Sequence, residues 1–148
     1  MMNVAITGAN GLVGANLCRV LINKGYRVKA LYFKRNNALE DLDVELLQGN
    51  VLDPQAMDKL TKGVDVVFHA AARITIGNMS YEELHEANVT GTRTVFNAAL
   101  KNGVKTFVNF SSVHALKLND NKSLCNEDCP FALDSDNLYE RSKAIAQD

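Results

Sequence analysis

Three glycines near the amino terminus have a spacing that suits phosphate binding. Gly8, Gly11 and Gly14 directly follow the apolar run at 4–6 and open a stretch with helical periodicity. In such a turn the first glycine permits a tight bend, the second lets the backbone approach a pyrophosphate, and the third lets the helix lie close to its sheet. The helix N-terminus then offers free N–H groups to the phosphates. We therefore predict a dinucleotide-binding turn with contacts from Gly8, Asn10, Gly11, Leu12, Val13 and Gly14.

A tyrosine and a lysine near the other end of the chain suit proton transfer. Tyr139 and Lys143 are four residues apart, so on a helix they share one face. A phenol with its ordinary pKa of about 10 is a poor acid–base group at neutral pH. A nearby ammonium favours the phenolate and lowers that pKa. The pair can then donate a proton to a carbonyl or accept one from an alcohol.

Two serines directly follow an apolar run further up the chain. Ser111 and Ser112 come after residues 105–110, whose composition predicts a strand. Ligands of open α/β sheets bind beyond the carboxyl ends of the strands. Both serine hydroxyls are therefore candidates for contacts with a substrate.

The residues after the second predicted strand bear on which dinucleotide would bind. An acidic side chain here binds the ribose 2′-hydroxyl of NAD, but the strand ends in Leu31-Tyr32-Phe33-Lys34-Arg35 with no Asp or Glu. Lys34 and Arg35 suit a 2′-phosphate, for which arginine has the matching donor geometry. We therefore predict NADP as the cofactor, with NAD as the alternative.

The segments that must position these residues alternate between strands and helices. The apolar runs are continuous, which is typical of a parallel sheet covered on both faces by helices. The repeated strand–helix–strand order predicts a Rossmann-type, doubly wound α/β fold, with residues 1–148 as one domain. We expect strands over 4–6, 28–33, 44–47, 64–68 and 105–110, helices over 12–24, 54–61 and 81–102, a helix beginning near 137, and an irregular loop over 117–136.

Composition and charge argue against several classes of protein. The chain has 148 residues and a formal net charge of −1, so it lacks the basic surface of nucleic-acid-binding proteins. No apolar run approaches the roughly 20 residues needed to cross a bilayer. No basic region precedes the first apolar run, as it would in a secretory leader. We expect a cytoplasmic protein with no nucleic-acid or membrane partner.

The cysteines and histidines give little sign of further chemistry. Cys18, Cys125 and Cys129 are too few for a disulfide scaffold, and reduced thiols are the simplest interpretation. Cys125 and Cys129 with His114 would make a poor zinc signature, so we predict no metal site. His69 and His114 are expected to be structural and His85 to be a solvated helix residue.

The motifs together resemble the short-chain dehydrogenase/reductase superfamily, in its extended epimerase/dehydratase form. The resemblance covers nearly the whole chain in order. It includes the glycine turn, a segment similar to the adenine-contacting one at Gly49-Asn50-Val51-Leu52-Asp53, and a cofactor-lining segment at His69-Ala70-Ala71-Ala72. Asn50 stands where the family more often has Asp. The resemblance thus adds Asn50, Val51, Ala70, Ala71 and Ala72 to the expected cofactor contacts.

The same resemblance implies a catalytic set. Asn88-Val89-Thr90-Gly91-Thr92 is similar to the helix motif whose asparagine supports the proton relay. Ser112 matches the serine that orients the reacting oxygen, with Ser111 as the competing choice. Tyr139 and Lys143 match the Tyr-x-x-x-Lys motif, in which tyrosine exchanges the proton and lysine also holds the nicotinamide ribose, so both belong to the cofactor site as well.

The resemblance leaves three activities open. The segments 110–116 and 126–130 look similar to the dihydroflavonol-reductase-like branch, which implies NADP-dependent reduction of a ketone or aldehyde. A nucleotide-sugar epimerase or dehydratase of the same superfamily, acting on a sugar nucleotide, is the second hypothesis. A dinucleotide-binding module without catalysis, or an inactive fragment, is the third. Extended members are about twice as long, so we expect a partial form that lacks the C-terminal substrate domain. The resemblance also implies a homodimer through the helices that carry Asn88 and Tyr139.

Overall fold

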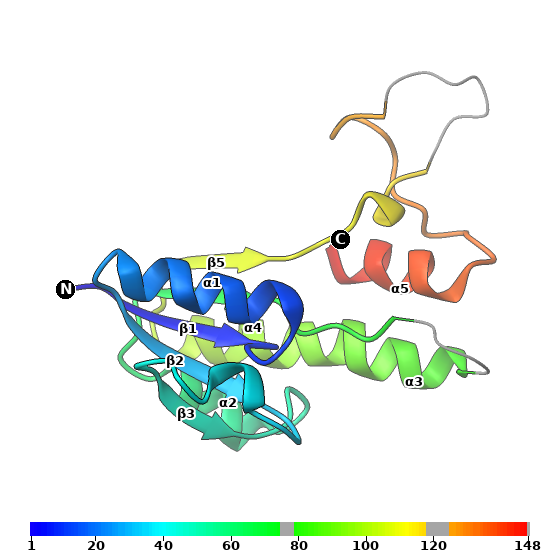
Figure 1. Cartoon of the computed structure of the whole chain (residues 1–148). Helices are drawn as coiled ribbons and strands as arrows, with labels where there is room; N and C mark the ends of the chain where they lie inside the picture. The colour runs from blue at the N-terminus through cyan, green and yellow to red at the C-terminus, as the bar shows by residue number, and fades with distance from the viewer. Residues whose placement is uncertain (75–78, 118–124, 148) are drawn as a thin grey trace.

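A five-stranded parallel sheet forms the centre of the molecule (Figure 1). The computed structural model describes residues 1–74, 79–117 and 125–147. The strand order is β3-β2-β1-β4-β5, so the chain crosses from one edge to the middle between β3 and β4. The strands are β1 (Asn3–Thr7), β2 (Arg27–Tyr32), β3 (Glu45–Gln48), β4 (Val66–His69) and β5 (Thr106–Asn109).

Helices cover both faces of this sheet, as predicted. On β1, the side chain of Ile6 packs with Leu21 on one face, whereas Ala5 packs with Met57 and Val95 on the other. This alternation follows from the two-residue period of a strand. The first face is covered by α1 (Leu12–Asn23), and the second by α2 (Pro54–Thr61) and α4 (Gly91–Lys101).

The long helix predicted over 81–102 exists, but a wide turn interrupts its α-helical geometry. It consists of α3 (Tyr81–His85), a π-helical segment η2 (Glu86–Thr90) and α4. Ser80 and Glu83 form a capping box at its start. The π-helical turn brings Asn88 and Val89, which are neighbours in sequence, into the interior together. Local sequence pattern does not predict such a turn, because it depends on what the helix packs against.

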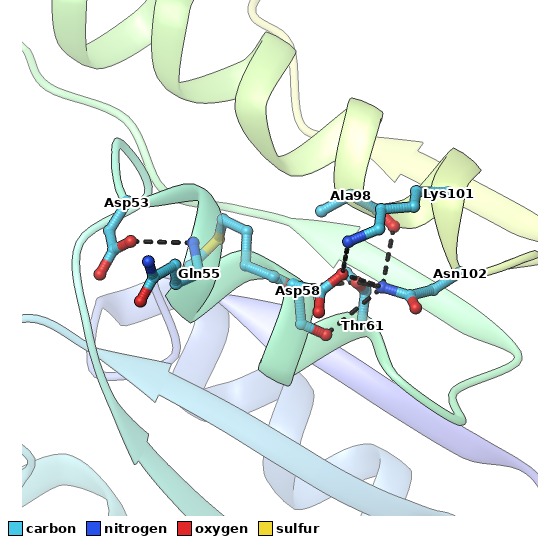
Figure 2. A network of polar contacts seen from close by, with 8 residues as sticks. Asp53, Gln55, Asp58, Thr61, Ala98, Lys101 and Asn102 are labelled. Carbon is cyan, nitrogen blue, oxygen red and sulfur yellow. Dashed lines mark hydrogen bonds and ion pairs between the residues drawn. The ribbon is translucent and has the colours of Figure 1, made fainter.

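Polar contacts fasten α2 to α4 on their shared face of the sheet (Figure 2). Asp58 Oδ1 accepts from Lys101 Nζ at 2.7 Å and from Asn102 Nδ2 at 3.1 Å. The Asn102 amide also donates to Thr61 Oγ1 at 2.9 Å. At the other end of α2, Asp53 caps the helix by accepting from Gln55 N at 2.9 Å, as its position before Pro54 predicts.

The last helix lies beyond the carboxyl end of β5 (Figure 1). This helix, α5 (Leu138–Gln147), packs against the 3₁₀ turn η3 (Val113–Ala115), against η2 and against α3. Part of the irregular loop predicted over 117–136, residues 118–124, lies outside the described residues. The flanks of that stretch meet in an antiparallel bridge between Leu116 and Phe131. A second 3₁₀ turn, η1 (Asn37–Leu39), follows β2.

Candidate functional site

A cleft of about 920 Å³ opens at the carboxyl ends of β1 and β2. Its volume is at the upper end of the range for small-molecule sites. It lies beside the point where the strand order reverses, between β1 and β4, which is where open α/β sheets bind ligands. The predicted cofactor residues that line it are Gly8, Asn10, Gly11, Lys34, Arg35, Asn50, Val51, Ala71 and Ala72.

The glycine turn has the close approaches that its spacing predicts. Gly8 has a φ of +66°, and a Cβ there would lie 2.7 Å from the Ala71 nitrogen. A Cβ on Gly14 would overlap the Gly8 carbonyl oxygen and lie 2.7 Å from the Ala9 Cα. A Cβ on Gly11 would meet only the Gly8 oxygen, at 3.2 Å. Gly8 and Gly14 thus close the turn tightly, and Gly11 leaves its outer side open to the cleft.

The first turn of α1 can contribute to an anion site only through its backbone. Leu12 is 84% exposed and Val13 is 51% exposed, and neither lines the cleft. Gly11 is the N-cap and the first turn contains no acidic side chain. The first N–H groups of a helix have no intrahelical acceptor and carry the positive end of its dipole. The turn therefore fits a dinucleotide pyrophosphate.

Two cations stand at the mouth of the cleft, after β2. Lys34 and Arg35 are exposed, and neither forms an ion pair within the part of the chain that the structure describes. Lys34 Nζ lies over the Phe33 ring, 5.5 Å from its centroid. On the other side of the cleft, Asn50 Oδ1 accepts from Leu52 N at 3.1 Å and shapes the turn after β3. Asn10 Oδ1 accepts from Ala38 N at 2.9 Å and ties the glycine turn to η1.

The tyrosine and lysine of the predicted motif lie on α5, outside the lining of the cleft. Lys143 is buried, and its Nζ donates to the carbonyl oxygen of Phe110 at 2.7 Å. Burial lowers the pKa of the Lys143 ammonium. Tyr139 is half-buried, with its ring centroid 6.2 Å from that of His114. The buried lysine is thus fixed at the end of β5, one helical turn from the tyrosine.

The two candidate serines differ in their partners. Ser112 is half-buried and caps η3, its Oγ accepting from His114 N at 3.2 Å. Ser111 is exposed, and its hydroxyl bonds to Gln147 at the end of α5. Among the described residues, Ser112, Tyr139 and Lys143 form no hydrogen bonds with one another through their side chains.

Asn88 is buried in the π-helical segment, and both polar atoms of its side chain form hydrogen bonds. Its Oδ1 accepts from Arg73 N at 2.7 Å, and its Nδ2 donates to Arg73 O and to Ser142 Oγ, each at 2.9 Å. The Ser142 hydroxyl in turn donates to the carbonyl of Tyr139 at 2.8 Å. The Asn88 amide thus holds α5 in place against the segment after β4.

Sequence reasoning missed the polar residues behind this site. Thr7, Thr92 and Ser142 are buried, and His69 lies between the two threonines. The positions of Thr7, at the end of a strand, and of Ser142, between the tyrosine and the lysine, are visible in the sequence. Their partners are distant in sequence, however, so only the fold reveals the contacts. Ala70, also expected at the cofactor, packs its carbonyl against Gly8 instead of lining the cleft.

The cysteines and the question of a metal site complete the list of candidates. Over the described ranges, no group of three His, Cys, Asp or Glu side chains could hold a metal ion. Cys18 lies on the buried face of α1, and burial raises the pKa of its thiol to about 11. Cys125 and Cys129 are half-buried free thiols. No helix in the described part of the chain has the length and apolar character required to cross a bilayer.

Comparisons with known proteins agree with this architecture. The chain is 33% identical to 2-alkyl-3-oxoalkanoate reductase of Stenotrophomonas maltophilia, over 99% of its own length and 44% of that protein. It is 35% identical to a putative dihydroflavonol 4-reductase of Synechocystis sp., over 75% of its length and 33% of that protein. It superposes with a TM-score of 0.84 on a short-chain dehydrogenase/reductase superfamily protein from Agrobacterium tumefaciens with bound NAD, at 26% identity, covering 98% of this chain and 43% of that one.

These matches confirm the predicted superfamily, and they include a dihydroflavonol-reductase-like relative. The chain spans less than half the length of each of these three proteins. A model of one family, described as the NAD dependent epimerase/dehydratase family, matches residues 4–148. The chain therefore belongs to the NAD-dependent epimerase/dehydratase family.

Proposed function

We propose that this chain is the cofactor-binding domain of an NAD(P)-dependent reductase that acts on a ketone or an aldehyde. The observation that carries the proposal is that two features lie at the same end of the sheet, where the strands have their carboxyl ends. The glycine turn opens a cleft at the end of β1, and α5 holds Tyr139 and the buried Lys143 beyond the end of β5. Two of the relatives are named as reductases, which supports reduction over other reactions of the family.

The residues of the cleft suggest how the cofactor is held. The backbone of Gly8, Gly11 and the start of α1 would bind the pyrophosphate. Lys34 and Arg35 would contact the adenosine end, where a 2′-phosphate distinguishes NADP from NAD. When bound, the nicotinamide supplies or accepts a hydride, and that chemistry belongs to the cofactor.

The side chains on α5 would carry out the proton transfer. Tyr139 donates its phenolic proton to the oxygen of the substrate carbonyl, and the Lys143 ammonium stabilises the phenolate that remains. The Phe110 carbonyl fixes the position of this ammonium. Ser112, at the end of η3, would orient the same substrate oxygen, while Asn88 supports α5 through Ser142.

A turnover assay tests this proposal. The protein is mixed with NADPH and a panel of ketones and aldehydes, and the loss of nicotinamide absorbance is followed. Steady oxidation that Tyr139→Phe abolishes is the expected result when the assayed protein also contains the substrate domain. Tyr26→Phe is the matched control, because Tyr26 packs against the core below α1, away from the site.

Other outcomes of this assay would point to the other two hypotheses. Conversion of a nucleotide sugar without net change of the cofactor, in protein purified with NAD bound, would establish an epimerase or dehydratase instead. Tight cofactor binding with no turnover of either substrate class would identify a binding module. Full activity in Tyr139→Phe would refute the proposed mechanism for both enzymes.

We also propose that two copies associate through the α4 side of the molecule. Phe96 is 47% exposed and Leu100 is 70% exposed, one helical turn apart on this helix. Together they form an exposed apolar surface of the kind that often marks a protein–protein contact. Light scattering after size exclusion would show a dimer. Phe96→Glu should shift it to a monomer, whereas a monomeric wild-type protein would contradict the proposal.

A further inference from the structure

A buried histidine connects the glycine turn with the π-helical segment that supports α5. His69 ends β4, is 2% exposed, and is paired in register with Thr7 at the end of β1. Its Nδ1 lies 2.7 Å from Thr7 Oγ1, and its Nε2 lies 3.0 Å from Thr92 Oγ1. Each ring nitrogen therefore has one hydroxyl partner, and the two hydroxyls belong to opposite parts of the site.

The direction of each hydrogen bond follows from groups that can only accept or only donate. Thr92 Oγ1 lies 2.6 Å from the Asn88 carbonyl oxygen, so the Thr92 hydroxyl donates its one proton there. The Thr92 oxygen must then accept from His69, which places the ring proton on Nε2. The Nδ1 of this neutral ring accepts from the Thr7 hydroxyl. The Thr7 oxygen accepts in turn from the Ala71 N–H, at 3.3 Å.

A protonated ring would not satisfy these partners. Both ring nitrogens would donate, and the Thr7 oxygen would face two N–H groups while its own proton lost its acceptor. Burial, with a smaller contribution from the Lys143 ammonium on α5, lowers the pKa of His69 to about 4. The ring is therefore neutral at neutral pH.

The chain of contacts reaches the cofactor turn on one side. Thr7 precedes Gly8, and its carbonyl accepts from Ala70 N at 3.2 Å. With the Ala71 contact, Thr7 holds the backbone after β4 against the glycine turn, where a Cβ on Gly8 would collide with it.

On the other side the chain of contacts reaches the helix with the tyrosine. Thr92 fixes the Asn88 carbonyl, Asn88 Nδ2 donates to Ser142 Oγ, and Ser142 donates to the Tyr139 carbonyl. A continuous series of hydrogen-bonded residues therefore connects the ring of His69 to both halves of the site.

We propose that His69, as its neutral Nε2–H tautomer, is a positioning residue that couples the cofactor turn to the helix carrying Tyr139 and Lys143. The catalytic meaning of that helix rests on the proposed function, but the tautomer and the coupling do not. His69 does not line the cleft, and its ring acts through Thr7 and Thr92. Cofactor affinity should therefore depend on Thr92, although Thr92 does not line the cleft.

Nitrogen-15 NMR of the histidine side chains tests the tautomer directly. We expect His69 to show a protonated Nε2 and an unprotonated Nδ1 that does not titrate between pH 5 and 8, approximately the range where a free histidine changes charge. His85, which is half-buried, and His114, which is exposed, give separate signals for comparison in the same spectrum. A protonated Nδ1 on His69, or a change in the charge of its ring between pH 5 and 8, would overturn the proposal.

Hydroxyl-deleting variants test the coupling. Thr92→Val should weaken the affinity for NADPH and NADH by about fivefold or more, the range of ordinary site–site coupling. It should also speed amide hydrogen exchange in α5, and Thr92→Ser should restore both. Thr94→Val is the matched control, since Thr94 makes the same kind of bond to Thr90 O, at 2.9 Å, but is less buried than Thr92 and has no histidine partner among the described residues.

The outcomes separate this inference from the proposed function. Equal cofactor affinity in Thr92→Val, Thr94→Val and wild type would refute the coupling even in an active reductase. A weakened affinity in Thr92→Val that serine restores would support it even if Tyr139→Phe kept full activity. If the wild type bound neither cofactor, the change in hydrogen exchange across α5 and the NMR signature would still decide the question.

Discussion

The ammonium of Lys143 is buried with the carbonyl oxygen of Phe110 as its hydrogen-bond acceptor, 2.7 Å away. An ammonium has three N–H donors, and no other acceptor for them occurs among the described residues. The burial of a charge with so few partners is unfavourable. It therefore destabilises the folded protein and lowers the pKa of this lysine. Such an arrangement is typical of functional sites, where electrostatic strain is retained for chemistry.

Replacement of this lysine should therefore raise stability while it removes function. We expect Lys143→Met to increase the free energy of unfolding in urea by about 1 kcal/mol, because it removes a poorly compensated buried charge. Carbonyl reduction should be lost. Lys29→Met is the control: Lys29 also donates to a carbonyl, Lys62 O at 3.0 Å, but it is more exposed and lies near Glu45. A lower stability of Lys143→Met than of wild type would contradict this account.

Gly8 and Gly25 form a matched pair for testing the turn. Both have positive φ, +66° and +80°, but a Cβ would collide with the Ala71 nitrogen only at Gly8. Gly25→Ala should cost about 1 kcal/mol from backbone strain alone and leave cofactor affinity unchanged. Gly8→Ala should cost clearly more and abolish NADPH binding, measured by calorimetry. Equal effects of the two substitutions would show that the close approach at Gly8 does not matter.

Lys34 and Arg35 should determine the preference between the two dinucleotides. Replacement of both by serine removes two cations that have no acidic partner among the described residues. We expect NADPH affinity to fall by about tenfold or more, with NADH affinity nearly unchanged, since only NADPH carries the 2′-phosphate. Lys24→Ser, at the far end of α1, controls for the loss of a single surface cation away from the cleft. Parallel losses for both cofactors would exclude a specific 2′-phosphate contact.

The neutral state of His69 should make stability depend on pH. Its pKa is about 4 in the folded protein, against 6.5 in an unfolded chain. The unfolded chain therefore binds more protons between these values, so stability falls as pH decreases from about 6.5 to about 4. At about 1.4 kcal/mol per pH unit, the loss is roughly 3 kcal/mol.

Thr7→Val and His69→Asn provide the check on this pH dependence. His69→Asn should unfold more readily at pH 7 but lose less further stability between pH 6.5 and 4 than wild type does. Thr7→Val retains the histidine and should keep the pH-dependent loss, because burial is its larger cause. A wild-type protein whose urea midpoint is constant over this interval would contradict a buried neutral His69.

Local features of the sequence were sufficient to predict the fold and the position of the glycine turn. The glycine spacing, the Asp53-Pro54 helix start and the continuous apolar strands are short-range signals, because caps, turns and strand periodicity involve residues close together in the chain. The predicted strands at 64–68 and 105–110 correspond to β4 (Val66–His69) and β5 (Thr106–Asn109), with small shifts at their ends.

Only the tertiary structure determines the contacts that support the candidate site. Thr7 and His69 are 62 residues apart in sequence, and Asn88 and Ser142 are 54 apart. Their pairing depends on strand register and on a π-helical turn, both of which arise from packing over the whole sheet. The residue types of Tyr139 and Lys143 were readable from the sequence. The burial of Lys143 was not, because it depends on the end of β5 and on η2, which come from distant parts of the chain.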